Sequence, residues 1–208
     1  MEAVGELLGI RDGDIQSQLS HYIPEDSPFA YQYAIHLREH ILNHGHKLLA
    51  AYEDLMSEVI APMFLKDHGL DQGEVLYQFP PTLRIFPSVD PPRALGRFHT
   101  DHEYGHQVCE INYWLPITNA GGDHASLWCE QSAGLGNFAP FDLKYGEIRR
   151  FHAVSLAHGT YPNDTGRTRI SLDFRLALEE EFDRRYTHPG PKVRFKHLMR
   201  RWSAASSS

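Results

Sequence analysis

The stretch Arg169-Ile170-Ser171-Leu172-Asp173-Phe174-Arg175-Leu176 alternates polar and apolar residues without a break. Because successive side chains of a β-strand point to opposite faces, this pattern predicts one strand with a charged face and an apolar face. Burying charged side chains without partners is costly. We therefore expect the apolar face to pack in a core and the charged face to line a cavity that holds a charged ligand.

Other short apolar or alternating runs, separated by turns, precede this strand. They predict strands over residues 75–79, 82–86, 96–101, 109–117, 125–129, 147–152 and 154–158, before the last one over 168–177. Asn119-Ala120-Gly121-Gly122-Asp123 predicts a turn between two of them. Several short strands with regular turns indicate a closed or double-sheet β architecture.

The first part of the chain has a helical pattern instead. Apolar residues recur there at steps of three and four, and Pro62 and Gly69 are expected to end the helical part. The residues that carry this pattern are Ala34, Leu37, Ile41, Leu48, Leu49, Tyr52, Leu55, Val59 and Ile60. We predict one domain over 1–208: helical support over 1–72, a β core over 73–178, and a C-terminal extension over 179–208 with a disordered tail.

A candidate metal site comes from Phe98-His99-Thr100-Asp101 together with the distant His158. In a strand, His99 and Asp101 point the same way, and His158 joins them if the sheet folds back. Two imidazoles and one carboxylate leave coordination positions open, which suits Fe(II) oxygen chemistry. The alternative for the first pair is a hydrogen-bonded surface pair, because the chain has 14 histidines and 27 acidic residues.

A candidate carboxylate site follows the second histidine. The Arg169 guanidinium can bind a carboxylate through two parallel hydrogen bonds, and the Ser171 hydroxyl can add another. Arg167 lies on the same strand face and competes with Arg169 for this role, and Arg84 on an earlier strand is a further inward candidate. An ordered set of His, Asp, His, Arg and Ser is hard to reach by accident.

These residues carry a family resemblance. Residues 80–178 resemble the iron(II)/2-oxoglutarate-dependent oxygenases, in the phytanoyl-CoA-hydroxylase-like branch. The matching text is Phe98 through Asp101, Asn112 through Thr118, Gly121-Gly122, Gly146-Glu147, Phe151, His158-Gly159, Asn163 and Arg169 through Arg175. The wording from His99 to His106 and from Glu110 to Pro116 resembles the compact oxygenases of aminoglycoside antibiotic pathways, of the streptomycin and hygromycin type. Where the branch usually has Pro-Gly-Ser-His, this chain has Trp128 through Gly134.

The resemblance implies a mainly β fold with N-terminal helices. Its core would be a double-stranded β-helix (jelly-roll, cupin-like), with helices packed on the outer sheet. It implies Fe(II) on His99, Asp101 and His158, and O2 and 2-oxoglutarate as co-substrates. The far carboxylate of 2-oxoglutarate would bind Arg169 and Ser171, and Asn112 would also contact this co-substrate. For Asn112 a plain structural hydrogen bond is the alternative.

The substrate contacts are expected near the metal motif and along the arginine strand. The loop after Asp101 must lie close to the metal, and Trp128 can form an apolar or sugar-stacking wall, although core packing is the commoner role of Trp. The candidates are His102, Glu103, His106, Trp128, Asp173 and Arg175. This polar set indicates a hydrophilic small molecule rather than an acyl chain.

Composition limits the partners. A net charge of −7 argues against nucleic acid, which needs clustered Lys and Arg on one face. The basic stretch from Arg184 to Arg201 is expected to be a solvated helix face or tail. We see no signal-peptide pattern and no apolar run long enough for a bilayer, so we predict a cytoplasmic protein without a membrane partner, with Cys109 and Cys129 as reduced thiols.

The sequence thus predicts an Fe(II)/2-oxoglutarate-dependent dioxygenase that hydroxylates a polar small molecule or closes a ring in it. An amino sugar or aminoglycoside intermediate of antibiotic biosynthesis is the favoured substrate. One alternative is a cupin-like metalloenzyme without 2-oxoglutarate, in which Arg169 and Ser171 bind a substrate carboxylate. Another is a non-catalytic barrel that binds a metabolite. The oligomeric state is not predicted.

Overall fold

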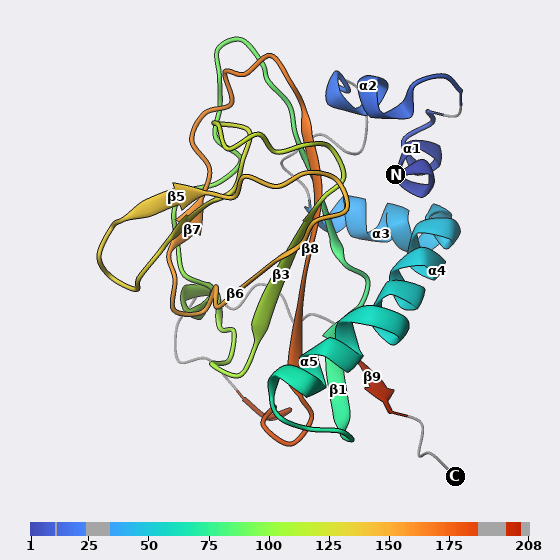
Figure 1. Ribbon diagram of the computed structural model, residues 1–208. Coiled ribbons are helices and arrows are strands. Elements are labelled where there is room, and N and C mark those ends of the chain that lie inside the picture. Colours follow the sequence, from blue (N-terminus) through green and yellow to red (C-terminus); the bar gives the residue numbers. More distant parts are fainter. Residues whose placement is uncertain (11, 24–33, 187–198, 205–208) are drawn as a thin grey trace.

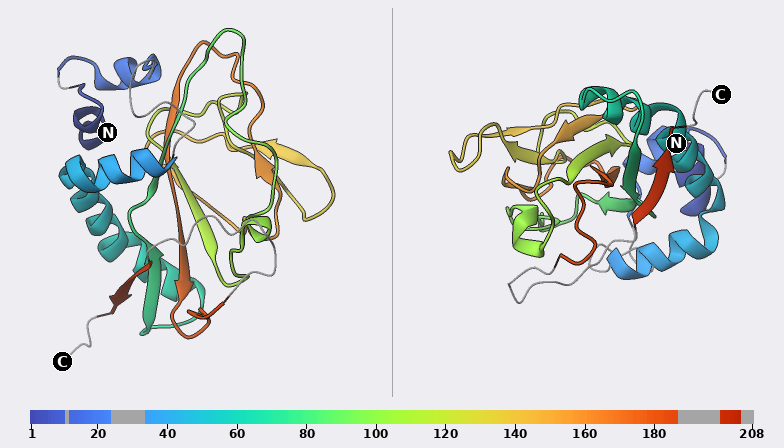
Figure 2. Two further views of the ribbon diagram at one scale, coloured as in Figure 1. Left: turned by 180° about the vertical axis from the view of Figure 1, so that it is seen from behind. Right: turned by 90° about the horizontal axis from the view of Figure 1, so that it is seen from below.

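The computed structural model describes residues 1–10, 12–23, 34–186 and 199–204. Two antiparallel sheets form the β part of the molecule. The larger sheet lies between the helices and the smaller sheet, as Figures 1 and 2 show from different sides. The arrangement confirms a mostly β protein with helices on one outer face, whereas the finer assignment as a double-stranded β-helix stays a prediction.

The helical layer comes from the first third of the chain. It contains α1 (Glu2–Leu7), α2 (Ile15–Ser20), α3 (Ala34–His44), α4 (His46–Leu55), the π-helical turn η1 (Met56–Ile60) and α5 (Ala61–Asp67). The expectation that Pro62 ends the helical part is wrong. It lies in the first turn of α5, where a missing N–H is tolerated, and α4, η1 and α5 follow one another without a break. The end comes at Gly69, whose φ of +72° suits glycine.

The larger sheet is built around β8 (Arg169–Leu178). Its strand order is β6 (Arg149–Phe151), β3 (Ile111–Pro116), β8, β1 (Glu74–Gln78) and β9 (Met199–Ser203), and β2 (Thr82–Phe86) also pairs with β8. The strands β1 and β2 share one edge of β8 in succession, while β3 covers the other edge. Because β8 is paired along both edges, its side chains are held in a fixed register over the cavity described below.

The smaller sheet has the order β5 (Phe138–Pro140), β4 (Trp128–Glu130) and β7 (His158–Gly159). A β-bridge adds the chain at His99 to the free edge of β7. Its two backbone hydrogen bonds join His99 N–H to the His158 carbonyl at 3.0 Å and His158 N–H to the His99 carbonyl at 2.9 Å. This bridge places two of the predicted metal ligands side by side.

Apolar burial fixes the layers. One cluster joins the helices to the outer face of the larger sheet and includes Tyr52, Phe64, Ile170, Phe174 and Leu176. A second cluster, around Trp114 and Phe141, lies on the other side of that sheet. The alternation predicted for Arg169 through Leu176 is confirmed, because its apolar members pack in the first cluster.

Most predicted strands are present with shifted ends, but several expectations are wrong. The strand predicted over 154–158 is absent, because residues 153–156 lie in a turn and β7 begins only at His158. Residues 96–101 form no strand beyond the bridge at His99, because the 3-10 helix η2 (Asp101–Tyr104) begins at Asp101. The strand β5 was not predicted. The C-terminal extension contains β9, which pairs with β1, so its last described part is not a free tail. The predicted disordered tail over 203–208 is wrong at its start, because Ser203 ends β9. Residues 205–208 and the middle of the basic stretch, 187–198, lie outside the described residues. The single-domain division stays a prediction.

Candidate metal centre

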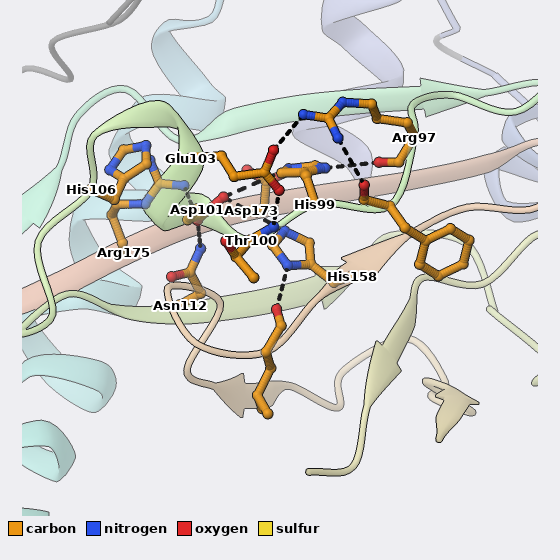
Figure 3. A network of polar contacts seen from close by, with 12 residues as sticks. Arg97, His99, Thr100, Asp101, Glu103, His106, Asn112, His158, Asp173 and Arg175 are labelled. Carbon is orange, nitrogen blue, oxygen red and sulfur yellow. Dashed lines mark hydrogen bonds and ion pairs between the residues drawn. The ribbon is translucent and has the colours of Figure 1, made fainter. Parts of the chain in front are cut away.

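The structure brings His99, Asp101 and His158 together. His99 comes from the β-bridge, Asp101 opens η2 and His158 begins β7. One ligand atom from each of the three lies within 4.8 Å of the others. Asp101 Oδ1 is 3.7 Å from His99 Nε2 and 3.6 Å from His158 Nε2, too far for hydrogen bonds (Figure 3). A metal ion between these three atoms is the arrangement that their positions favour.

Both imidazoles are oriented for metal binding by backbone carbonyls. His99 Nδ1 lies 2.8 Å from the carbonyl of Arg97, and His158 Nδ1 lies 3.0 Å from that of Leu156. A carbonyl only accepts, so each Nδ1 must carry the proton. This leaves the lone pair of each Nε2 free toward Asp101, which is the tautomer that a metal requires. Burial lowers the pKa of His158, which also favours its neutral form.

The two oxygens of the Asp101 carboxylate have different neighbours. Oδ2 accepts hydrogen bonds from Asn112 Nδ2 and Arg175 Nη2, both at 2.9 Å, while Oδ1 faces the histidines (Figure 3). Burial alone would raise the pKa of Asp101. The charge of Arg175 is the largest of several influences that lower it, and together they outweigh burial and hold that pKa well below its usual range. The carboxylate is therefore ionised at neutral pH with one oxygen available.

Local sequence explains how the chain reaches this geometry. At the start of η2, Thr100 and Glu103 form a capping box, in which Thr100 N–H donates to the Glu103 carboxylate at 3.1 Å. Beside β7, Gly159 lets the neighbouring chain approach closely. A Cβ on Gly159 would lie 2.9 Å from the Cα of Phe98, the residue before His99. The glycine is thus required for the bridge that joins the two histidines.

The three candidate ligands line an open cavity of about 580 Å³, a volume that includes solvent at its opening. The cavity extends along the inner face of β8, where Arg169, Asp173 and Arg175 line it. The candidate metal ligands and Arg169 therefore open into the same space, whereas Ser171 does not line it.

Arg169 is the most unusual residue of this cavity. It is 1% exposed, and its Nε and Nη1 find no hydrogen-bond partner among the residues that the structure describes. Its guanidinium lies 5.0 Å from the ring centre of Phe86 and 5.6 Å from that of Trp114. Burial, and next the charge of Arg84, lower the pKa of Arg169 to about 9. A buried cation in this state lacks an anion.

Ser171 lies two residues after Arg169, on the same face of β8, and its hydroxyl also lacks a hydrogen-bond partner among the described residues. It is fully buried. The two competing arginines are already paired: Arg167 with Asp123, and Arg84 with Asp173. Of the three arginines considered from the sequence, Arg169 is the one whose charge the structure leaves uncompensated.

The predicted substrate contacts divide into two groups. Asp173 and Arg175 line the cavity, but Asp173 pairs with Arg84 and Arg175 with Asp101. The structure does not bring the other four to the cavity wall. These are His102, Glu103, His106 and Trp128. Trp128 packs edge-on against Tyr161 and donates from Nε1 to the Asp123 carbonyl.

Asn112 lies in the cavity wall but holds Asp101, so the structural hydrogen bond weighed for it from sequence is present. Its predicted contact with 2-oxoglutarate stays a prediction. The sequence interpretation missed Arg97, which lines the cavity and pairs with Glu103. Its position two residues before His99, on the same face of an expected strand, was the available signal. It also missed Glu110, whose place in the site is described below.

Comparison with known proteins gives a limited result. No protein-family model matches the chain. The streptomycin biosynthesis protein StrG of Streptomyces griseus is 33% identical over 130 residues, which are 62% of this chain and 60% of StrG. The chain thus spans about three fifths of the relative it matches.

Two solved structures of the non-haem monooxygenase ThoJ, the apo form and a nickel complex, align with 85% of this chain and 66% of theirs. Their TM-scores are 0.45 and 0.44 at 15% and 17% identity, values that say nothing about function. Within the residues that the structure describes, no helix is long and apolar enough to cross a membrane.

Proposed function

We propose that this protein is a non-haem Fe(II)- and 2-oxoglutarate-dependent oxygenase that oxidises a polar small molecule. One observation carries the proposal. A His-Asp-His set and a buried arginine, which has no anionic partner among the described residues, open into the same cavity. 2-Oxoglutarate has a keto-acid group that chelates a metal and a second carboxylate that needs a cation, so it matches both ends.

The charges support this pairing. At the metal end, Asp101 and Glu110 are buried carboxylates and Arg175 is the buried cation beside them. Two negative charges against one positive charge leave this end suited to a divalent cation. At the other end, Arg169 carries a positive charge that the described residues do not compensate. A divalent metal and a dicarboxylate would neutralise both ends together.

The residues present fit both groups. Two neutral imidazoles and one carboxylate are a donor set for Fe(II) that leaves positions open. When bound, iron and 2-oxoglutarate would activate O2, which is the oxidant that removes a hydrogen atom from the substrate. The protein holds the metal through His99, Asp101 and His158, and orients the far carboxylate through Arg169 and Ser171. The side chains of Trp114, Leu127 and Phe151 would reduce water access from the apolar walls of the cavity.

The similarity to StrG supports a role in antibiotic biosynthesis. We therefore propose an amino sugar or aminoglycoside intermediate as the substrate, and hydroxylation or oxidative ring closure as the reaction. Hydrogen-atom removal begins either outcome, so the position of the substrate in the cavity decides between them. The cytoplasm, where reduced iron and free thiols persist, is the proposed location.

Succinate release tests the proposal. The protein, incubated with Fe(II), 2-oxoglutarate and O2, should form succinate, and His99→Ala should reduce the rate at least 100-fold by removing one ligand. His124→Ala is the matched control, because this exposed histidine pairs with Asp164 away from the cavity. Succinate formation by His99→Ala at the wild-type rate would overturn the ligand set. A wild-type protein that binds metal but ignores 2-oxoglutarate would favour the cupin-like alternative.

A further inference from the structure

Behind the candidate metal ligand Asp101 lies a closed set of buried polar side chains, formed by Arg175, His106 and Glu110. Arg175 Nη2 donates to Asp101 Oδ2 at 2.9 Å, and Arg175 Nη1 donates to His106 Nε2 at 2.8 Å. His106 Nδ1 lies 2.8 Å from Glu110 Oε2, which is also 3.6 Å from Arg175 Nε. Figure 3 shows Arg175 between His106 and Asp101.

The directions of these hydrogen bonds are fixed by chemistry. Arg175 can only donate, so His106 Nε2 must accept, and His106 Nδ1 must therefore carry a proton that it donates to Glu110. His106 is thus a neutral imidazole in one defined tautomer, with both nitrogens engaged. The second oxygen of Glu110 accepts from the backbone N–H of Gln107 at 2.8 Å. Each member of the set is held by another member or by the backbone.

We propose that His106 and Glu110 are positioning residues for the metal, acting through Arg175 on Asp101. They hold the Arg175 guanidinium so that it occupies Asp101 Oδ2 and turns Oδ1 toward the two histidines. The proposal rests on the metal-binding role of Asp101 in the proposed function. It replaces the sequence interpretation that placed His106 and Arg175 against the substrate.

Burial makes this set more than a surface ion-pair network. Asp101, Glu110 and Arg175 are each 5% exposed, and the His106 side chain is 12% exposed. In this environment an arginine that loses its acceptors can turn away from the carboxylate, and Asp101 Oδ2 would then compete with Oδ1 for the metal. Supporting residues behind metal ligands typically contribute 10- to 100-fold in affinity.

The test measures Co(II) binding without 2-oxoglutarate, using the visible absorption of the bound ion and a competing chelator. His106→Leu should weaken Co(II) binding about 10- to 100-fold and change the absorption spectrum, because Arg175 loses its acceptor. His106→Gln, whose side-chain oxygen can replace Nε2 as acceptor, should recover most of the affinity. Simple loss of packing would not produce this difference between Leu and Gln.

His68→Leu is the matched control. This half-buried histidine is likewise held by a hydrogen bond, to the backbone carbonyl of Phe64, but belongs to the helical layer. It should leave Co(II) affinity unchanged. Wild-type affinity in His106→Leu, or equal weakness in His106→Gln, would overturn the proposal. If His106→Leu does not fold, Glu110→Gln takes its place, with the same expected loss and the same contradicting result.

Failure of the proposed function would look different. A wild-type protein that binds Co(II) normally but shows no response to 2-oxoglutarate contradicts the co-substrate and leaves the positioning role intact. A wild-type protein that binds no Co(II) overturns the positioning role itself.

Discussion

Replacing Arg169 by methionine should stabilise the protein in the absence of ligand while removing its response to 2-oxoglutarate. Methionine keeps most of the length of the side chain and fills irregular space well. It removes a buried positive charge whose Nε and Nη1 lack partners among the described residues. If Arg169 serves to bind 2-oxoglutarate, its buried charge costs stability in the protein without ligand. Replacing it should therefore raise the stability and abolish the binding.

The magnitude follows from the burial of Arg169. Desolvation, with a smaller effect of Arg84, lowers the pKa of Arg169 from the ordinary value of an arginine to about 9. At about 1.4 kcal/mol per pH unit, this difference is roughly 5 kcal/mol against the charged form. The contacts with the rings of Phe86 and Trp114 offset about 1–2 kcal/mol. The remainder is about 3–4 kcal/mol. We expect Arg169→Met to raise the free energy of unfolding by about 1–4 kcal/mol, the range seen when buried charged groups are replaced by apolar ones.

Urea unfolding at pH 7 with and without Mn(II) and 2-oxoglutarate is the assay. At a co-substrate concentration 100 times Kd, the wild type should gain about 2.7 kcal/mol beyond the effect of Mn(II), and the variant should gain almost none. Arg167→Met, which removes an arginine already paired with Asp123, should change stability little and keep the response. The reasoning is refuted if Arg169→Met is destabilised by more than about 1 kcal/mol and still responds to 2-oxoglutarate.

The pH dependence has a defined sign. Because the folded pKa of Arg169 lies below the unfolded one, the folded state binds fewer protons from about pH 9 up to the ordinary pKa of arginine. Stability from this group therefore rises with pH in that window, and its cost is fully present below it. The advantage of Arg169→Met should be constant near neutral pH and should shrink above about pH 9.

Two further results are expected. Gly159→Ala should lower the free energy of unfolding by about 1–3 kcal/mol and weaken Co(II) binding, because its Cβ would lie 2.9 Å from the Cα of Phe98. Gly96→Ala is the control, because a Cβ there meets nothing within 4 Å. Equal losses in both variants would contradict the argument. Burial raises the pKa of Cys109 to about 11 and that of Cys129 to about 12. After a few minutes with iodoacetamide at pH 8, mass spectrometry should therefore find both thiols unmodified in the folded protein and modified in urea. Rapid modification of the folded protein would contradict the raised pKa values.

The sequence pattern predicted those strands in which polar and apolar residues alternate over many positions. The other strands depend on pairing with distant segments of the chain, which the local pattern does not show. The alternation over 169–176 identified β8 directly. Residues 199–203 read as part of a basic tail because their strand depends on pairing with β1, more than a hundred residues earlier. His99 and Asp101 were expected on one strand, but the strand ends at the bridge with His158. The backbone of His158, rather than local preference, decides where His99 lies.

The sequence identified most residues of the candidate site, but it did not assign the role of each residue as well. The order and spacing of His99, Asp101, His158 and Arg169 indicated a metal and a carboxylate from the sequence alone. The sequence could not separate a side chain that contacts substrate from one that supports a ligand. His106 and Arg175 have the right chemistry for either role, and only the hydrogen bonds of Arg175 with Asp101 and His106 indicate support.

Anaerobic titration of the Fe(II)-loaded protein with 2-oxoglutarate, followed by visible absorption, tests the central claim most directly. We predict a metal-to-ligand charge-transfer band that grows and saturates, because the keto acid chelates iron held by His99, Asp101 and His158. The same titration of Arg169→Met should require much higher 2-oxoglutarate concentrations. Iron that is demonstrably bound without any such band would contradict the claim and make Arg169 a contact for a different anion.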